Sequence, residues 1–207
     1  MTKKGSSSNR WIDRHLSDKW VQQAQVDGYR SRASYKLIEI DQRDRLFRGG
    51  SVVVDLGAAP GGWSQVASRR LKGGGQVIAL DLLAIEPMDG VNLIRGDFRD
   101  QAVLDELLDL LEGQPVDLVM SDMAPNISGI KAVDQPAMLY LVELALDFSR
   151  QVLKPGGKML VKTFEGAGMA PYRQQVKESF ERVVMRKPDA SRDSSAEQYL
   201  LATGFRG

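Results

Sequence analysis

From residue 51 onward, short apolar segments alternate with amphipathic ones, and this alternation constrains the fold more than any other feature of the sequence. The apolar segments predict strands over 51–57, 76–82, 91–98, 116–125, 158–164, 182–188 and 197–205. The segments between them predict helices over 61–71, 100–113, 135–153 and 171–181. Such alternation is typical of an α/β fold in which helices cover both faces of a mostly parallel sheet.

The first 50 residues differ from the rest in composition. Residues 1–10 include the stretch KKGSSSNR, which predicts a flexible basic tail, and helices are expected over 16–26 and 31–46. Residues 1–50 carry 11 Lys and Arg against 6 Asp and Glu, whereas the remainder carries 17 against 21. We expect a single domain over 11–207, made of a basic helical segment, 11–50, and a Rossmann-like core, 51–207. The charge asymmetry suits a polyanionic partner or, equally, a solvated basic surface.

Residue usage excludes several kinds of chemistry. The chain has no cysteine and a single histidine, His15, so disulfides, a cysteine nucleophile and a histidine-based metal site are not expected. No apolar stretch approaches the roughly 20 residues that span a bilayer, and the start lacks the apolar centre of a signal peptide. We therefore expect a cytoplasmic protein with no metal and no membrane contact.

Charged residues end five of the expected strands. They are Asp55, Asp81, Asp97, Asp122 and Lys162. An aspartate at one strand end is unremarkable, because Asp is common in turns and helix caps. In a parallel α/β sheet, however, ligands bind at the carboxyl ends of the strands, so all five point to one functional edge.

A glycine-rich loop follows the first strand in the stretch VVVDLGAAPGGWSQ. Gly57, Gly61 and Gly62 open the next helix, where backbone amides can meet a polar ligand. The loop has neither the G-x-G-x-x-G pattern of dinucleotide sites nor the G-K-[ST] ending of a P-loop. Asp81 is placed to accept the two hydroxyls of a ribose, and Asp97 to meet an exocyclic amine such as that of adenine. These features together predict S-adenosyl-L-methionine as the cofactor, with S-adenosyl-L-homocysteine as its product.

Four stretches carry a family resemblance: DLGAAPGGWSQ, SDMAPN, GGKMLVKTF and SRASYKL. Together they resemble the FtsJ (RrmJ) family of ribosomal RNA 2′-O-ribose methyltransferases, and the similarity extends from about Arg10 to Gly204. The resemblance implies a class I methyltransferase fold with a seven-stranded, mostly parallel sheet whose last strand, EQYLLATGF, is antiparallel. It also implies that S-adenosylmethionine contacts are made by Gly61, Trp63, Asp81, Asp97 and Asp122, beside the loop residues Gly57 and Gly62.

The same resemblance implies a catalytic group of Lys36, Asp122, Lys162 and Glu197. Lys162 is expected to be central, either as the base for a ribose hydroxyl or as a charged donor that stabilises the developing alkoxide. Asp122 and Glu197 would orient the lysines, and Lys36 would position the ribose. Without the family pattern, Lys36 and Glu197 read as solvated charges, and Trp63 as a residue that packs its helix.

Cations interleaved with aromatic residues in the N-terminal segment suit phosphate contacts and base stacking. The predicted RNA-binding residues are Arg10, Lys19, Arg30, Arg32 and Lys36. Charge reversal at Arg30 and Arg32 is expected to weaken RNA binding and to spare cofactor binding. By resemblance, the substrate is a uridine ribose of 23S ribosomal RNA in the large subunit, modified by a monomer in support of ribosome maturation. Transfer RNA, capped RNA, a small-molecule substrate and a non-catalytic role in RNA binding and assembly stay open.

Overall fold

A computed structural model describes residues 18–192 and 195–207. The helices are α2 (Lys19–Val26), α3 (Ala33–Asp44), α4 (Gly62–Leu71), α5 (Gln101–Leu111), α6 (Lys131–Val152) and α7 (Met169–Ser179). The strands are β1 (Val52–Leu56), β2 (Gln76–Asp81), β3 (Val91–Arg95), β4 (Val116–Ser121), β5 (Leu153–Phe164), β6 (Phe180–Arg186) and β7 (Glu197–Phe205). The predicted tail 1–10, and with it Arg10, lies outside the described residues.

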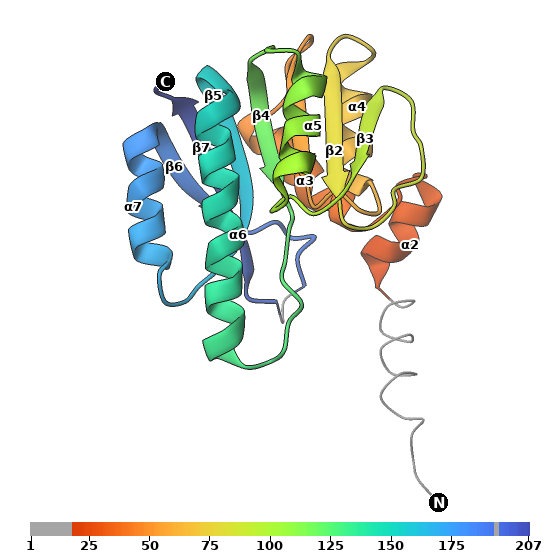
Figure 1. Cartoon of the computed structure of the whole chain (residues 1–207). Helices are drawn as coiled ribbons and strands as arrows, with labels where there is room; N and C mark the ends of the chain where they lie inside the picture. Colours follow the sequence, from red (N-terminus) through yellow and green to blue (C-terminus); the bar gives the residue numbers. More distant parts are fainter. Residues whose placement is uncertain (1–17, 193–194) are drawn as a thin grey trace, which may run out of the picture.

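The seven strands form one sheet in the order β3-β2-β1-β4-β5-β7-β6 (Figure 1). The pairs from β3 to β5 are parallel, and β7 runs antiparallel to both β5 and β6. The predicted class I methyltransferase fold is therefore confirmed. In the described part of the chain, no helix combines the length and apolar character needed to cross a membrane.

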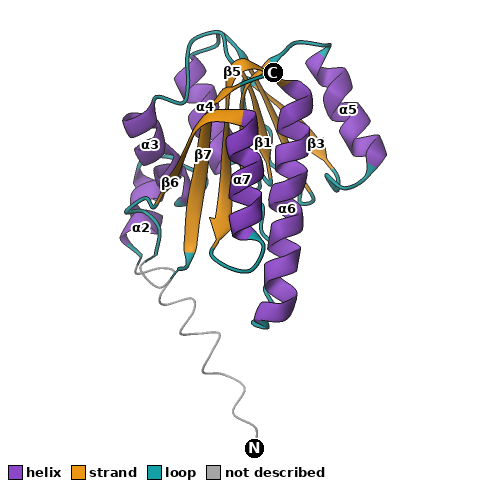
Figure 2. Cartoon of the chain, turned by 90° about the vertical axis from the view of Figure 1, so that its left-hand side faces the viewer, coloured by secondary structure: helices purple, strands orange, loops and turns teal. Residues whose placement is uncertain are grey.

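Alternate residues of β1 enter two separate cores, because successive side chains of a strand point to opposite faces. Val52, Val54 and Leu56 pack on the side of α5, α6 and α7. Val53 packs on the other side, with residues of α3 and α4. Figure 2 shows the resulting three layers, with the sheet between the two groups of helices.

Several predicted boundaries differ from those of the structure, and two of these differences have a clear cause. The segment KPGG was expected to lie between helix and strand, but β5 begins at Leu153 and includes it. Val116 pairs with Leu153 and Leu118 with Lys158, so a bulge absorbs the extra residues of β5. Helix α6 begins at Lys131, before the expected start at 135, because Asp134 accepts bonds from Ser128 and Gly129 at its N-terminus.

Candidate functional site

The carboxyl ends of β1 and β4 lie side by side at the middle of the sheet, where the strand order reverses. The loops that leave these strands are joined by backbone hydrogen bonds. Asp122 N donates to Leu56 O at 3.1 Å, and Gly57 N donates to Leu80 O at 2.9 Å. The expected functional edge is thus one continuous backbone surface, which fits the rule for ligand sites in open α/β sheets.

Each glycine of the loop meets a different steric demand. Gly57 has φ 76°, and a Cβ there would lie 2.6 Å from the Met123 side chain. Gly61 has φ 101°, again in the region that favours glycine. A Cβ at Gly62 would lie 2.3 Å from Ser31 Oγ, so this glycine allows α4 to pack closely on the start of α3. Gly57 and Gly61 shape the loop, whereas Gly62 serves helix packing.

Asp81 and Asp97, at the ends of β2 and β3, are held by nearby groups. Asp81 Oδ2 accepts the Ala59 amide at 2.8 Å, and its Oδ1 accepts the Leu83 amide at 2.8 Å. Arg99 donates to both carboxylate oxygens of Asp97 and lowers the pKa of that carboxyl to about 2. Both carboxyl groups are partly exposed, so their oxygens can still accept donors from a ligand.

Asp55 is the exception among the charged strand ends, because it is completely buried. Ser64 Oγ donates to its Oδ2 at 2.6 Å, while its Oδ1 has no hydrogen-bond partner within the described residues. Burial raises the pKa of Asp55 to about 7, the Ser64 bond opposes the rise, and the charges of Asp122 and Asp81 add to it. This carboxyl therefore belongs to the interior under the site.

The predicted catalytic residues Lys36, Asp122, Lys162 and Glu197 form two ion pairs. Lys162 Nζ lies 3.1 Å from Asp122 Oδ1 and donates to the Asp122 carbonyl at 2.5 Å. Lys36 is paired with Glu197, and this contact lowers the pKa of Glu197 although burial alone would raise it. Their side chains are only 10% to 22% exposed, so Lys36 and Glu197 are not the solvated charges that a reading without the family pattern suggests.

Tyr199 joins the two ion pairs and was missed in the sequence. Lys36 Nζ donates to its hydroxyl at 3.2 Å, and that hydroxyl donates to Asp122 Oδ1 at 2.9 Å. Burial, followed by the charges of Asp122 and Glu197, raises the pKa of Tyr199 far above its usual value, so it stays a neutral donor. Its position two residues after Glu197, on the same face of β7, is the signal that could have found it.

Trp63 lies in the core with 2% of its surface exposed. Its indole packs on Tyr199, with ring centroids 5.5 Å apart, and donates to the Ala33 carbonyl at 2.9 Å. The packing role is thus the one that its side chain fills. The Trp63 backbone amide lies in the first turn of α4.

The predicted RNA-binding arginines have partners inside the protein. Arg30 donates to the carbonyls of Glu86 at 2.5 Å and Pro87 at 2.8 Å, which lie in the segment between β2 and β3. Arg32 is paired with Asp18, and its exposure is 14%. Lys19 is exposed and stacks over Trp20 at 5.0 Å. Of these three residues, Lys19 presents its cation most openly to a partner.

The comparison with protein families concerns almost the whole described chain. The model of the FtsJ-like methyltransferase family matches residues 29–205. The chain belongs to the FtsJ-like methyltransferase family. This FtsJ-like methyltransferase carries the glycine loop, Asp81, Asp97 and the two ion pairs within the matched region.

Relatives are similar over their full length. The sequence is 58% identical over 203 residues to "Ribosomal RNA large subunit methyltransferase E" of Alkalilimnicola ehrlichii, covering 98% of this chain and 97% of the relative. It is 54% identical to the protein of the same name from Pseudomonas aeruginosa, with 99% of each chain covered.

Solved structures share the fold. A Plasmodium falciparum protein assigned as a ribosomal RNA methyltransferase superposes with a TM-score of 0.79 at 30% identity, covering 86% of this chain and all of that one. Human methyltransferase-like protein 13, solved in complex with SAH, has a TM-score of 0.54 at 13% identity, covering 83% of this chain and 77% of that one. The second likeness concerns the fold alone.

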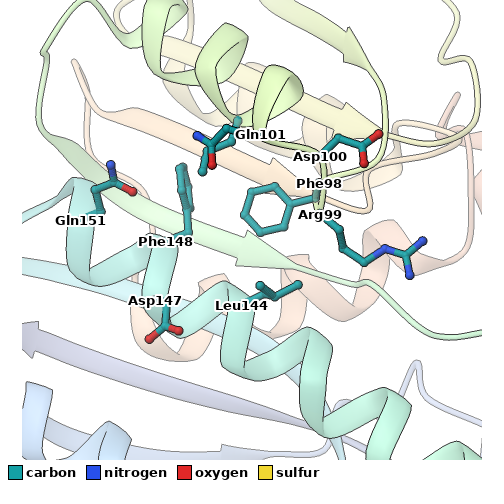
Figure 3. A pocket seen from close by; sticks show the side chains of 9 residues that line it. Phe98, Arg99, Asp100, Gln101, Leu144, Asp147, Phe148 and Gln151 are labelled. Carbon is teal, nitrogen blue, oxygen red and sulfur yellow. The ribbon is translucent and has the colours of Figure 1, made fainter.

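A cavity of about 240 Å³ lies between α5 and α6 of the FtsJ-like methyltransferase, with Phe98 and Arg99 in its lining (Figure 3). Phe98 and Phe148 meet edge to face at its floor, with centroids 5.4 Å apart. Polar side chains, among them Gln101 and Gln151, surround them. Within residues 18–192 and 195–207, no three His, Asp or Glu side chains are grouped so that they could hold a metal ion.

Proposed function

We propose that this protein transfers a methyl group from S-adenosylmethionine to the 2′-oxygen of a uridine ribose in 23S ribosomal RNA of the large subunit. The observation that carries the proposal is the pair of coupled ion pairs, Lys162–Asp122 and Lys36–Glu197, at the sheet edge that also carries the glycine loop. The names of the relatives, which specify the ribosomal large subunit, support the choice of substrate.

The residues at the edge fit the proposed cofactor. Gly57 and Gly61 have positive φ angles, which favour glycine, and the loop that they form lies against the end of β2. The Asp81 carboxylate suits ribose hydroxyls, and the Asp97 carboxylate suits an exocyclic amine. When bound, S-adenosylmethionine supplies an electrophilic methyl group. The amides of Gly62 and Trp63, the Gly61 backbone, whose own amide donates to the Ala58 carbonyl at 2.6 Å, and the Asp122 side chain complete the proposed contacts.

Lys162 is proposed to contact the ribose hydroxyl that attacks. Its Nζ already has two acceptors from Asp122, so its orientation is set, and a third hydrogen can reach the substrate oxygen. This arrangement supports the charged-donor role over the base role. As a charged donor, Lys162 would stabilise the 2′-oxygen while the hydroxyl proton passes to water, so that the oxygen attacks with negative charge developing on it. Positioning of this kind can supply about 7–11 kcal/mol of the barrier.

Lys36 and Glu197 are proposed to position the ribose from the other side. Tyr199 links Lys36 to Asp122, so a shift of one ion pair is felt by the other. Lys19 and the basic N-terminal segment are proposed to contact RNA phosphates. The protein is proposed to act as a monomer in the cytoplasm. Arg30 and Arg32 are proposed as indirect contributors that hold the segment in place, because their guanidinium groups have internal partners.

The test is transfer of labelled methyl from S-adenosylmethionine to large ribosomal subunits from cells that lack this gene. We expect label on one ribose 2′-oxygen with the wild type and none with Lys162→Ala. Absence of label with intact cofactor binding would contradict the substrate, and transfer RNA and capped RNA would then be assayed. If Lys162→Ala still supports ribosome maturation in cells, a non-catalytic assembly role is correct.

A further inference from the structure

Three aliphatic side chains lie exposed close together on the segment that follows Asp122. Ile127, Ile130 and Val133 are 63%, 59% and 55% exposed. They fall within seven residues of one another, at the end of the β4–α6 connection and in the first turn of α6. Figures 1 and 2 show that this part of the chain projects beyond the carboxyl edge of the sheet. We call these three residues the apolar rim.

The apolar rim is built on an ordered turn. The carboxylate of Asp134 accepts the Ser128 amide at 2.9 Å, the Ser128 hydroxyl at 2.8 Å and the Gly129 amide at 3.0 Å. The Ser128 hydroxyl also accepts the Ile130 amide at 3.1 Å. These bonds fix the backbone that carries the rim, so its aliphatic side chains are presented to solvent in a defined arrangement.

The apolar rim borders the proposed catalytic group. Ile127 is the fifth residue after Asp122, and an extended chain over five residues spans at most about 18 Å. On the other side, Gln135 Oε1 accepts the Ala167 amide at 3.3 Å, which ties α6 to the loop that follows β5 and Lys162. A substrate whose ribose reaches Lys162 therefore passes the rim with an adjacent part of its structure.

Charge and size favour a nucleobase as the occupant. Lys131 is the one charged residue between 123 and 133, and the nearest acid, Asp134, is engaged by Ser128 and Gly129. Three aliphatic side chains are far smaller than the roughly 800 Å² per partner of a stable protein interface. Apolar side chains beside a cation instead suit a base face flanked by phosphate, as in proteins that wedge aliphatic residues between bases.

Burial of the site explains why such a contact is needed. The side chains of Lys162 and Asp122 are 10% and 22% exposed, so a ribose within a continuous base stack cannot easily reach them. A nucleotide must leave the stack first, and the lost stacking costs free energy.

We propose that Ile127, Ile130 and Val133 pack against the RNA base next to the target nucleotide and keep that nucleotide unstacked while its ribose reaches Lys162. The inference rests on the proposed function and deepens it by assigning an RNA contact outside the basic segment.

Crosslinking tests the contact directly, because the chain has no cysteine of its own. Ile127→Cys, Ile130→Cys and Tyr140→Cys would each carry a thiol-linked aryl azide and be irradiated on large subunits. Tyr140 is the matched control, 47% exposed and further along the same helix. We expect the two rim positions to crosslink to RNA within a few nucleotides of the methylated one, and the control to give no such product. Crosslinks to a ribosomal protein, or equal crosslinks from all three, would overturn the inference.

Kinetics provide the second readout. The triple variant Ile127→Ser, Ile130→Ser, Val133→Ser is expected to lower kcat/KM on large subunits by about tenfold, since wedge contacts offset the cost of unstacking. Its S-adenosylmethionine affinity should be unchanged, and Tyr140→Ser should stay within about twofold of wild type. If the triple variant has a kcat/KM within twofold of the wild-type value, the proposed role of the apolar rim is wrong. If the wild type methylates no RNA, the proposed function itself fails, which is a different result.

Discussion

The acidic side chains at the ends of β2 and β3 have hydrogen-bond partners at most 22 residues away in the chain, whereas the charged side chains at β4, β5 and β7 have partners 40 or more residues away. Asp97 is held by Arg99, two residues away. Lys36 reaches Glu197 and Tyr199, more than 160 residues away. The first region leaves carboxylates partly exposed for a small ligand, and the second holds charges in a fixed, mostly buried arrangement suited to chemistry.

The largest effect is expected at Lys162, in the buried region. Lys162→Ala should lower the single-turnover rate of methyl transfer by about 10²- to 10³-fold, the loss typical of a donor that acts on developing charge. Cofactor affinity should be unchanged. Lys154 lies on the same strand as Lys162 and forms an ion pair with Asp117 of β4. Lys154→Ala, which breaks that ion pair, is the matched control and should keep the wild-type rate. If the rate of Lys162→Ala is within tenfold of the wild-type rate, the buried region does not have the catalytic role that distinguishes it from the exposed region.

The pH dependence of the same step separates the two roles of Lys162. A charged donor predicts a rate that falls at alkaline pH as the ammonium loses its proton, whereas a base predicts a rate that rises with pH.

Asp55, under the boundary between the regions, predicts a pH effect on stability. Its folded-state pKa of about 7 lies above the ordinary value of 3.8, so its contribution to stability is complete below about pH 4 and is lost as pH rises through 7. We expect the wild type to lose on the order of 4 kcal/mol relative to Asp55→Asn between pH 4 and 8. Urea unfolding at both pH values measures this, and parallel profiles would contradict it.

Asp81→Asn tests the exposed region. The substitution replaces the carboxylate that accepts hydrogen bonds from the Ala59 and Leu83 amides and that is proposed to accept the ribose hydroxyls. Calorimetry should show S-adenosylmethionine affinity about tenfold to hundredfold lower, in line with about 1.5–3 kcal/mol for a charged hydrogen bond. Asp89→Asn, exposed in the same connection, should bind normally. Equal affinities for the two variants would remove Asp81 from the site.

Arg30→Gln distinguishes an internal contact from an RNA contact. Loss of the bonds to Glu86 and Pro87 should loosen the β2–β3 connection and lower cofactor affinity by about threefold to tenfold. Arg43→Gln, exposed on the neighbouring helix, serves as the control. If Arg30→Gln weakens only RNA binding, the role first expected from the sequence is correct after all.

Tyr199→Phe should have the smallest effect on the methyl-transfer rate, about twofold to threefold, because both ion pairs persist and the two lost hydrogen bonds, each worth about 1 kcal/mol, contribute mainly to stability. Tyr172→Phe is the matched control, since the Tyr172 hydroxyl is buried with no hydrogen-bond partner among the described residues. That change should leave activity unaltered and stability equal or higher. A loss at Tyr199 as large as that at Lys162 would make the hydroxyl part of the chemistry.

Local patterns were sufficient to predict the fold and the exposed half of the site. Apolar runs alternating with helices imply parallel strands, and parallel strands bring their carboxyl ends to one edge, so Asp81 and Asp97 could be placed without coordinates. The glycines could be placed for the same reason, although only packing separates Gly62, which faces Ser31, from Gly57 and Gly61. Lys36 and Glu197 were identified by the family resemblance, because the residues around them in the sequence do not mark them as functional.

The sequence by itself determined the order of the elements, the charged strand ends and the loop that leaves β1, because these depend on neighbours along the chain. Tertiary structure alone decided that Tyr199 links the two ion pairs, that the Trp63 indole is buried and that Arg30 and Arg32 have internal partners. The physical reason is that a hydrogen bond or an ion pair depends on distance in space, and the partners of these side chains come from elements that meet only when the chain has folded.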